Sequence, residues 1–385
     1  MRACRVRTRA TTNQTASTCA ARNKGGEVTI NCKRNAIIAT IFGGLACTAD
    51  SSGGRSLQAR AERVWGGASR GGVTALVRRG GMVETAAVGT ANPEGDPLVL
   101  DSVIAAGSVT KLFTATLIYQ LHENGRLELT ESLGTYLPMY KDYSEVTLEQ
   151  LLSHRGGVPN YTSNPEYVED LLRDPERILT TEELVAYASF EAPALPGQRF
   201  AYSNTGYSLL GMVIEQVTQA PLAEVLNEGI VAPLDLTATS LADPPGFPPD
   251  LVSGWLYPPN FGLPEHADLP VQPLAAPFSG CQADCGLITT VFELQVVLDA
   301  LFAGELISNE SLEKLTSSEA DAPNQGYGVE IYALGESDAF AYGHGGGGAG
   351  YTTLAVLEPE SGDLSIFFAN NDAIDLASLW SQYGL

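Results

Sequence analysis

The chain has 385 residues and a formal net charge of −23, with 44% hydrophobic and 17% charged residues, which is typical of a globular protein with a substantial core. Residues 1–47 hold eight lysines or arginines and one acidic residue, so the rest of the chain has 14 basic and 44 acidic residues. A surface this acidic repels nucleic acid phosphates and anionic lipid, and we expect neither as a partner of the folded part.

Residues 1–47 have the pattern of an export signal rather than of a folded unit. Two basic residues precede the apolar run 36–46, which is too short to span a bilayer. The run leads into Cys47 and is similar to a lipoprotein signal, so we expect Cys47 to be lipidated. Plain secretion after ordinary signal cleavage is the alternative. The first 27 residues fit neither a signal nor a fold, which places the expected start of the protein near Val28.

These features predict an exported protein of a bacterium, either a periplasmic or outer-membrane lipoprotein or a soluble secreted protein. Its only membrane contact would be a lipid anchor at Cys47. Residues 48–62 have the composition of a flexible polar tether, and we expect a catalytic domain over 63–385. Nothing in the sequence specifies an oligomeric state.

Two cysteines stand close together in the folded region, Cys281 and Cys285. In an oxidising compartment, cysteines separated by three residues can close a small disulfide loop. The alternative is two small residues that only pack. A zinc site would need two further ligands nearby, so we expect no metal.

Strand and helix patterns follow along the folded region. The runs 73–78 and 82–88 predict two strands joined by a glycine-containing turn. Residues 109–123 are apolar on nearly every side, which predicts a buried helix that ends at Asn124 and Gly125.

Helices are predicted in the middle of the chain and strands near its end. Between residues 126 and 310, helical patterns, prolines and loops predominate. Three strand-like runs and a short helical run follow: 327–332, 351–357, 364–369 and 374–383. Strands at both ends with helices between them predict an α+β fold. One antiparallel sheet would be built from the two ends and flanked by helices, with a mostly helical region beside it and the site between.

A candidate nucleophile stands at the start of the apolar helix. Ser108 and Lys111 are three residues apart, which places both side chains on one helical face. Backbone N–H groups at a helix start favour developing negative charge, and a buried lysine loses its proton more easily than one in water. The pair therefore offers an alcohol and a base. Ser311 and Lys314 have the same spacing, but their stretch is polar and typical of a solvated surface helix.

Tyr202 and Asn204 form a second candidate element, just before an apolar run. A tyrosine beside a lysine ammonium can relay protons between nucleophile and leaving group. The amide of Asn204 can hydrogen-bond both Lys111 and a substrate amide. Taken alone, Tyr-x-Asn is more often a loop with a buried tyrosine.

The glycine-rich run 343–350 is the third element and contains His344, Gly346 and Gly347. Glycines on a strand allow a ligand to approach the backbone closely and leave N–H groups to hold an oxyanion. A phosphate-binding loop is excluded because neither a helix start nor Lys-Ser/Thr follows. A flexible hairpin is the alternative.

In this chain order, the three elements resemble the motifs of the class C β-lactamase and D-alanyl-D-alanine carboxypeptidase superfamily, which includes related esterases. The flanking segments 104–111, 121–137, 151–159 and 200–211 are similar as well, and the resemblance covers roughly residues 65–385. The resemblance implies a β-lactamase/transpeptidase-like fold and a reaction that needs neither a metal nor an organic cofactor.

Position by position, the resemblance implies that Ser108 is the acylated nucleophile, Lys111 its base partner and Tyr202 the proton relay. Asn204 corresponds to the amide that orients the substrate. His154 lies in a turn-forming segment of the superfamily, and we expect it to be structural.

His344 stands where the lactamases have lysine, whereas carboxypeptidases and esterases of the superfamily often have histidine. The backbone N–H groups of Ser108 and Gly347 would form the oxyanion hole, with His344 and Gly346 binding substrate beside them. The resemblance thus predicts an acyl-serine hydrolase for D-alanyl peptides of cell-wall type, with a carboxylic-ester hydrolase or a β-lactamase as alternatives. A non-enzymatic penicillin-binding sensor or scaffold is the alternative from another class.

Overall fold

The chain divides into two units, Met1–Ser51 and Ser52–Leu385. The computed structural model describes residues 18–23, 26–31, 56–66, 70–244, 246–261, 264–265, 269, 271–335 and 339–383. In the first unit, strands β1 (Thr18–Asn23) and β2 (Gly26–Asn31) pair antiparallel, where the sequence predicted no fold before residue 28. The second strand carries valine and isoleucine, which favour extended structure. The predicted signal core and Cys47 lie outside the described residues.

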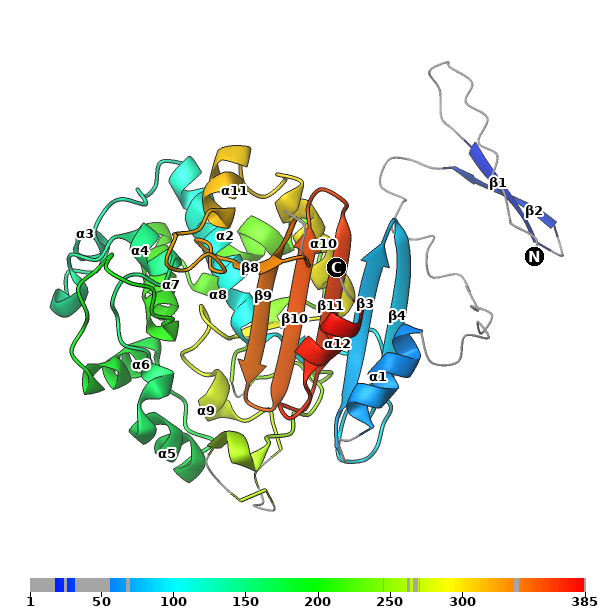
Figure 1. The fold of residues 1–385 in the computed structure, drawn as a ribbon, viewed down its shortest axis with the longest axis horizontal. Coiled ribbons are helices and arrows are strands. Elements are labelled where there is room, and N and C mark those ends of the chain that lie inside the picture. Colours follow the sequence, from blue (N-terminus) through cyan, green and yellow to red (C-terminus); the bar gives the residue numbers. More distant parts are fainter. Residues whose placement is uncertain are drawn as a thin grey trace. The chain divides into compact units, whose positions relative to one another are not determined.

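The second unit is organised around an antiparallel sheet of six strands (Figure 1). In spatial order its strands are β4 (Met82–Gly89), β3 (Gly72–Arg79), β11 (Asp363–Ala369), β10 (Tyr351–Glu358), β9 (Phe340–Gly348) and β8 (Glu330–Ala333). Strand β11 pairs with β3 from Leu364 opposite Arg78 to Ala369 opposite Val73. The prediction of one sheet built from both ends of the chain is therefore confirmed.

Two strand boundaries differ from the prediction. Strand β8 begins at Glu330 rather than at residue 327, because Gly328 has a φ of +136°, which breaks the extended run. The glycine-rich run is itself most of β9, and it pairs with β10 from Tyr342 opposite Leu357 to Gly348 opposite Tyr351. The run is therefore part of a β-hairpin: residues 343–348 are paired on the sheet, and Ala349 and Gly350 form the turn that leads into β10.

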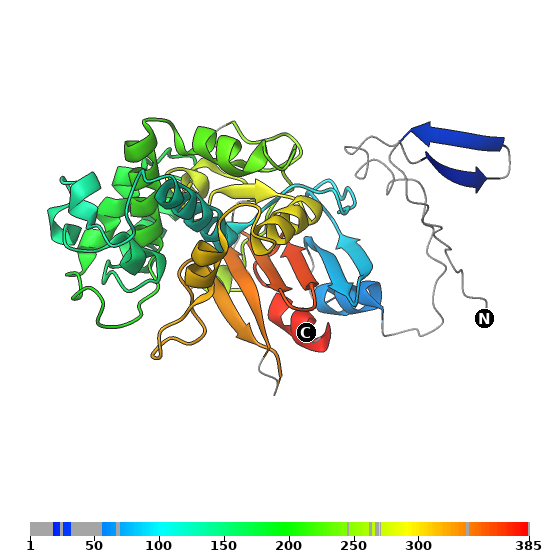
Figure 2. The same ribbon diagram turned by 90° about the horizontal axis from the view of Figure 1, so that it is seen from above.

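Helices cover both faces of the sheet, which explains why β3, β10 and β11 are apolar almost throughout. On one face lie α1 (Leu57–Trp65) and α12 (Leu376–Tyr383), as Figures 1 and 2 show. The expected tether over 48–62 is wrong from Leu57 onward, and the catalytic unit starts before residue 63. Leu57 and Ala61 are one turn apart and both buried against the sheet, which gives α1 its apolar stripe.

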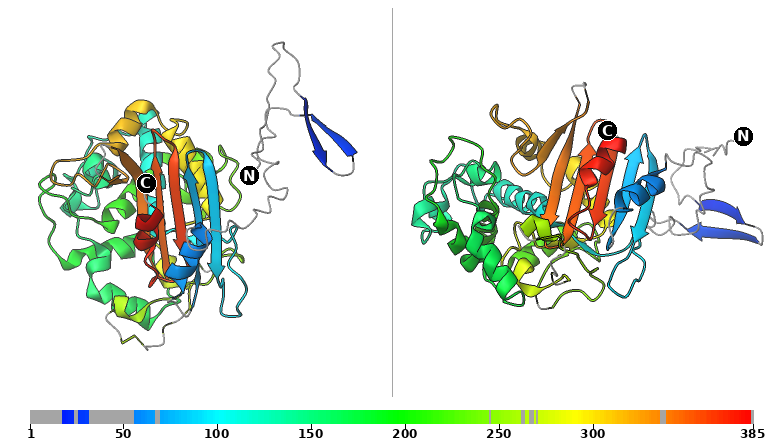
Figure 3. Two further views of the ribbon diagram at one scale, coloured as in Figure 1. Left: turned by 45° about the vertical axis from the view of Figure 1, so that its right-hand side comes forward. Right: turned by 60° about the horizontal axis from the view of Figure 1, so that its bottom comes forward.

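The other face packs against α2 (Thr110–Glu123) and α10 (Val291–Phe302), next to the mostly helical region (Figures 2 and 3). That region and its borders contain the remaining α-helices: α3 (Leu133–Tyr136), α4 (Leu148–Leu152), α5 (Pro165–Arg173), α6 (Thr181–Tyr187), α7 (Asn204–Thr218), α8 (Leu222–Leu226), α9 (Ala275–Phe278) and α11 (Asn309–Thr316). A small sheet of β5 (Ile104–Ala105), β7 (Leu287–Thr289) and β6 (Ser240–Leu241) lies at the start of α2 and was not predicted. Within the described ranges, none of the helices has both the length and the apolar character that a bilayer crossing requires.

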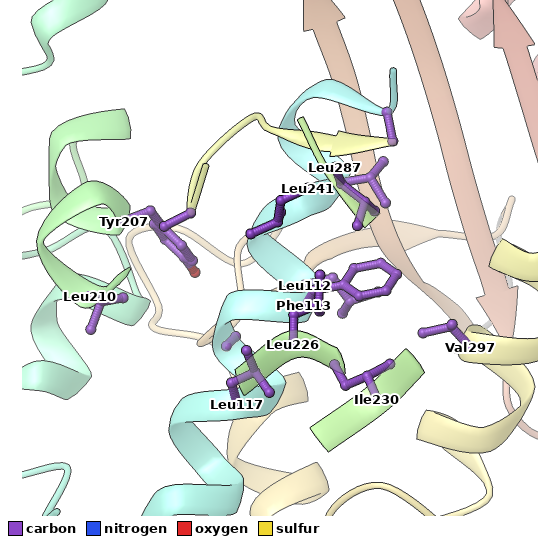
Figure 4. Close-up of a cluster of buried hydrophobic side chains, with 14 of the residues drawn as sticks. Leu112, Phe113, Leu117, Tyr207, Leu210, Leu226, Ile230, Leu241, Leu287 and Val297 are labelled. Carbon is purple, nitrogen blue, oxygen red and sulfur yellow. The ribbon is translucent and has the colours of Figure 1, made fainter. Parts of the chain in front are cut away.

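Helix α2 forms the centre of the core, as its sequence predicted. Leu112, Phe113 and Leu117 are buried among side chains from several surrounding elements, including Ile230 and Val297 (Figure 4). The helix ends where predicted: the N–H of residue 124 donates to the carbonyl of residue 120, and the glycine that follows has a φ of +64°. Burial on all sides fixes the helix, and with it the two residues at its start.

Candidate active site

Ser108 and Lys111 meet at the start of α2. A short 3₁₀ turn (Gly107–Val109) leads into the helix, and Gly107 takes a φ of +55° there. One helical turn separates the two side chains, and Nζ of Lys111 lies 3.2 Å from Oγ of Ser108. Lys111 is fully buried. The predicted alcohol and amine are therefore in hydrogen-bond contact.

The ammonium of Lys111 is held from several directions. Its Nζ donates a hydrogen bond of 2.7 Å to the backbone oxygen of Asp284. The same nitrogen lies 5.1 Å from the ring centre of Tyr202 and 5.6 Å from that of Tyr207, within the range of cation–π attraction. These contacts place the predicted proton relay beside the predicted base.

The second Ser-x-x-Lys pair has no such setting. On α11, Lys314 turns away to Glu149, at 3.2 Å, and lies 3.8 Å above the ring of Tyr327. The backbone N–H of Ser311 donates to the side chain of Ser308, the N-cap residue of this helix. The structure therefore confirms that context, and not spacing, distinguishes the two motifs.

Asn204 is the first residue of α7, and its side chain differs in one contact from the prediction. Its Nδ2 donates to Oγ1 of Thr162 at 3.3 Å, and its Oδ1 accepts no hydrogen bond from Lys111, whose Nζ donates instead to Oγ of Ser108 and to the backbone oxygen of Asp284. The side-chain oxygen Oδ1 is buried without a hydrogen-bond partner among the described residues, and Asn204 lines the cleft. Because this oxygen has almost no accessible surface, it can accept a substrate N–H only if the amide turns toward the cleft.

The glycine strand touches the nucleophile turn through bare backbone. A Cβ added to Gly346 would lie 2.2 Å from the backbone oxygen of Ala106 and 3.2 Å from the nitrogen of Ser108. A Cβ on Gly107 would lie 2.9 Å from the nitrogen of Gly347. No atom lies within 4 Å of the Cβ position of Gly347, which lines the cleft. Gly346 thus allows close packing, and Gly347 is the residue that faces the open site.

His344 lies on this strand, two residues before Gly346, and its side chain is buried. Its Nδ1 donates to the carbonyl of Gly345 at 2.5 Å and lies 3.9 Å from a carboxylate oxygen of Glu330. Burial lowers the pKa of His344, Glu330 raises it and the charge of Lys111 lowers it further. The ring centre lies 6.4 Å from that of Tyr202. The histidine therefore belongs to the same cluster of side chains as the predicted base and relay.

A cleft of about 630 Å³ opens in front of Ser108. Its walls come from the nucleophile turn, the glycine strand, the segment 161–171 and the segment 277–285. Much of the wall is apolar or aromatic: Tyr161, Pro165, Tyr167, Val168, Leu171, Pro277 and Phe278. The cleft is large enough for a small-molecule or peptide substrate.

The family model described as Beta-lactamase matches residues 57–376. The chain belongs to the β-lactamase family. It has the serine hydrolase fold of that family, an antiparallel sheet with helices on both faces.

Several relatives can be named. Penicillin-binding protein 4* of Bacillus subtilis is 25% identical over 295 residues, which cover 72% of this chain and 63% of that protein. Protein flp of Staphylococcus aureus is 31% identical over 141 residues, or 34% of this chain and 27% of its own. The chain thus spans less than two thirds of the length of these relatives.

Solved structures agree with the family assignment. A D-stereospecific amidohydrolase from Streptomyces sp. superposes with a TM-score of 0.71 at 26% identity, over 84% of this chain and 96% of that one. A penicillin-binding protein homologue from Pyrococcus abyssi gives a TM-score of 0.70 at 26% identity, over 83% and 74% of the two chains.

The sequence did not identify two residues that contact the site of this β-lactamase-family chain: His154, which was expected to be only structural, and Asp284, which was not singled out. His154 stacks on the ring of Tyr202, with centres 4.2 Å apart, and its Nδ1 accepts the backbone N–H of Ser203 at 3.1 Å. Burial, followed by the charges of Lys111 and His344, lowers the pKa of His154 well below its usual value, so the ring is neutral. The sequence marked it only as a turn residue.

Asp284 is the other residue, and it lies inside the predicted disulfide. Cys281 and Cys285 are bonded, with Cα atoms 5.4 Å apart, so that prediction is confirmed. The carboxylate of Asp284 is fully buried, and burial raises its pKa to about 6 although Lys111 opposes the shift. Its position between two cysteines was the only signal in the sequence. Among the described residues, no group of three or more His, Cys, Asp or Glu could hold a metal ion.

Proposed function

We propose that this chain is an acyl-serine hydrolase in which Ser108 is the nucleophile and Lys111 is the base. The observation that carries the proposal is the 3.2 Å contact between Nζ of the buried Lys111 and Oγ of Ser108, a residue that lines the cleft. A buried amine at this distance can accept the hydroxyl proton as the oxygen attacks a carbonyl carbon. Membership of the β-lactamase family supports the same roles.

The reaction would proceed in two steps. Oγ of Ser108 bonds to the carbonyl carbon while its proton passes to Lys111, and the N–H groups of Ser108 and Gly347 hold the oxyanion. Tyr202, in contact with the Lys111 ammonium, relays a proton to the leaving amine or alcohol, which departs as a neutral molecule. Water then attacks the acyl-serine, and its proton returns along the same groups.

We propose D-alanyl peptides of cell-wall type as the first substrate class. Support comes from the similarity to a penicillin-binding protein and to a D-stereospecific amidohydrolase. Asn204 lines the cleft, and its unpartnered oxygen can accept the N–H of such an acyl group once the amide turns toward it; the apolar wall of the cleft suits a small aliphatic side chain. An export signal ending at Cys47 would bring the enzyme to the cell wall.

Carboxylic esters are the second candidate. Among the described residues that line the cleft, none is lysine or arginine, so a leaving group without a carboxylate is accommodated equally well. A β-lactam is the third candidate, because the position of the lactamase lysine is taken by His344, whose ring is buried and bonded to its own strand.

Turnover assays on four compounds test the proposal: a D-Ala-D-Ala peptide, a D-amino acid amide, a short-chain nitrophenyl ester and a chromogenic cephalosporin. We expect the wild type to cleave the peptide best and Ser108→Ala to cleave none of them. If only the ester is cleaved, carboxylic esters and not D-alanyl peptides are the substrate class. Stable acylation by a fluorescent penicillin with turnover of no compound would support the penicillin-binding sensor or scaffold instead.

A further inference from the structure

We propose that the turn closed by the Cys281–Cys285 disulfide positions Lys111 against Ser108, with Asp284 as the positioning residue. This inference rests on the proposed function, because it assigns the turn a role only if Lys111 acts on Ser108. Neither cysteine nor Asp284 belongs to the three motifs that predicted the site.

The turn contacts α2 at three neighbouring positions. The Asp284 carbonyl accepts from Lys111 at 2.7 Å, and the Ala283 carbonyl accepts from Oγ1 of Thr114 at 2.6 Å. Just after the turn, the N–H of Leu287 donates to Oγ1 of Thr110 at 3.0 Å. The backbone of the turn therefore lies along the face of α2 that carries the base, and a shift of the turn would move the acceptor that orients the ammonium.

The carboxylate of Asp284 fixes the turn from its other side. Its Oδ2 accepts from the hydroxyl of Tyr161 at 3.0 Å, and its Oδ1 accepts from the hydroxyl of Ser208 at 2.9 Å. These partners come from the 3₁₀ turn Tyr161–Ser163 and from α7, so one side chain ties the turn to two separate elements. A fully buried carboxylate with both oxygens bonded is expensive to displace, which makes its position well defined.

The disulfide holds the two ends of this turn together. The N–H of Cys285 donates to the carbonyl of Cys281 at 2.8 Å, and the sulfur bond spans the same two residues. Cys281 is fully buried, whereas Cys285 is partly exposed and lines the cleft. A small reductant that enters the cleft therefore reaches the bond. Reduction by dithiothreitol breaks the S–S bond, gives two thiols and converts the reagent to its cyclic disulfide.

The test measures labelling of Ser108 by a fluorophosphonate, as a maximal rate of inactivation and a half-saturating concentration. The proteins are the wild type with and without dithiothreitol, Cys281→Ser/Cys285→Ser, Asp284→Ala and Asp284→Asn. Asp299→Ala is the matched control, because Asp299 pairs with Arg78 away from the cleft. Melting temperature is recorded for every sample.

A displacement of the base by about 1 Å lowers the maximal rate on the order of 100-fold. We expect this loss in the reduced wild type, in the double cysteine variant and in Asp284→Ala, with the half-saturating concentration unchanged. Asp284→Asn keeps partners for both hydroxyl groups and should recover most of the rate. Dithiothreitol should have no further effect on the double cysteine variant, and Asp299→Ala should label as the wild type does.

The outcomes separate the two proposals. No labelling of Ser108 in the oxidised wild type would remove the proposed function itself. Normal labelling of folded, reduced wild type would overturn the positioning role alone. A lower maximal rate accompanied by a higher half-saturating concentration and a lower melting temperature would also overturn it, because that pattern indicates general destabilisation. If a variant does not fold, the positioning role is decided by the labelling rate of the wild type before and after reduction by dithiothreitol.

Discussion

Replacement of Gly346 by alanine tests the contact between the glycine strand and the nucleophile turn. The added methyl would lie 2.2 Å from the backbone oxygen of Ala106, whereas real Cβ contacts essentially never fall below 3.0 Å. Both sides of this contact are backbone, so no side-chain rotation can relieve it. The strand and the turn must separate by about 1 Å, a displacement that costs about 100-fold in rate when it separates reacting groups.

The assay for Gly346→Ala is the maximal rate of fluorophosphonate labelling, together with the melting temperature. We expect a loss on the order of 100-fold, or about 3 kcal/mol of transition-state stabilisation. Gly347→Ala is the control for stability, because no atom lies within 4 Å of its Cβ position and the melting temperature should not change. A Gly346→Ala variant that melts and labels like the wild type would refute the packing described here.

Four further predictions concern single side chains. Lys111→Met should lower the labelling rate roughly 10²–10⁴-fold, the usual contribution of a general base, in a single-turnover measurement. Tyr202→Phe should lower kcat for the preferred substrate by about 100-fold, because it removes the relay but keeps the ring that packs on His154. Burial raises the pKa of Asp284 from 3.8 to about 6, so the folded protein holds this proton more tightly than the unfolded chain. The stability that this proton contributes is full below pH 3.8 and is lost as pH rises through 6, by about 3 kcal/mol, and urea titrations should show a flatter pH dependence in Asp284→Asn. The lowered pKa of His154 makes stability depend on pH in the opposite direction, because the folded protein resists protonation of this ring. The free energy of unfolding should fall as pH drops below 6.5, and it should fall less in His154→Gln.

The parts of the site that were predictable are those encoded locally. Ser108 and Lys111 lie on one helical turn, so their spacing and the apolar helix that follows were enough to pair them. Most of the large sheet could be predicted because short, largely apolar runs next to turn residues mark β3, β4, β10 and β11. The order of the three motifs along the chain then indicated the family.

The parts that were not predictable depend on tertiary contacts. Lys111 meets Asp284 across 173 positions of sequence, and Ser203 meets His154 across 49. No local pattern encodes either contact. The roles of Gly346 and Gly347 depend on which side of β9 faces the nucleophile turn, and strand register decides this.

The central claim is that Ser108, and no other serine, becomes acylated. Its most direct test is the intact mass of the protein after fluorophosphonate treatment, followed by peptide mapping, on the wild type, Ser108→Ala and Ser311→Ala. The structure predicts one addition on the peptide that contains Ser108, absent from Ser108→Ala and kept in Ser311→Ala. An adduct that persists in Ser108→Ala, or that maps to Ser311, would contradict the account.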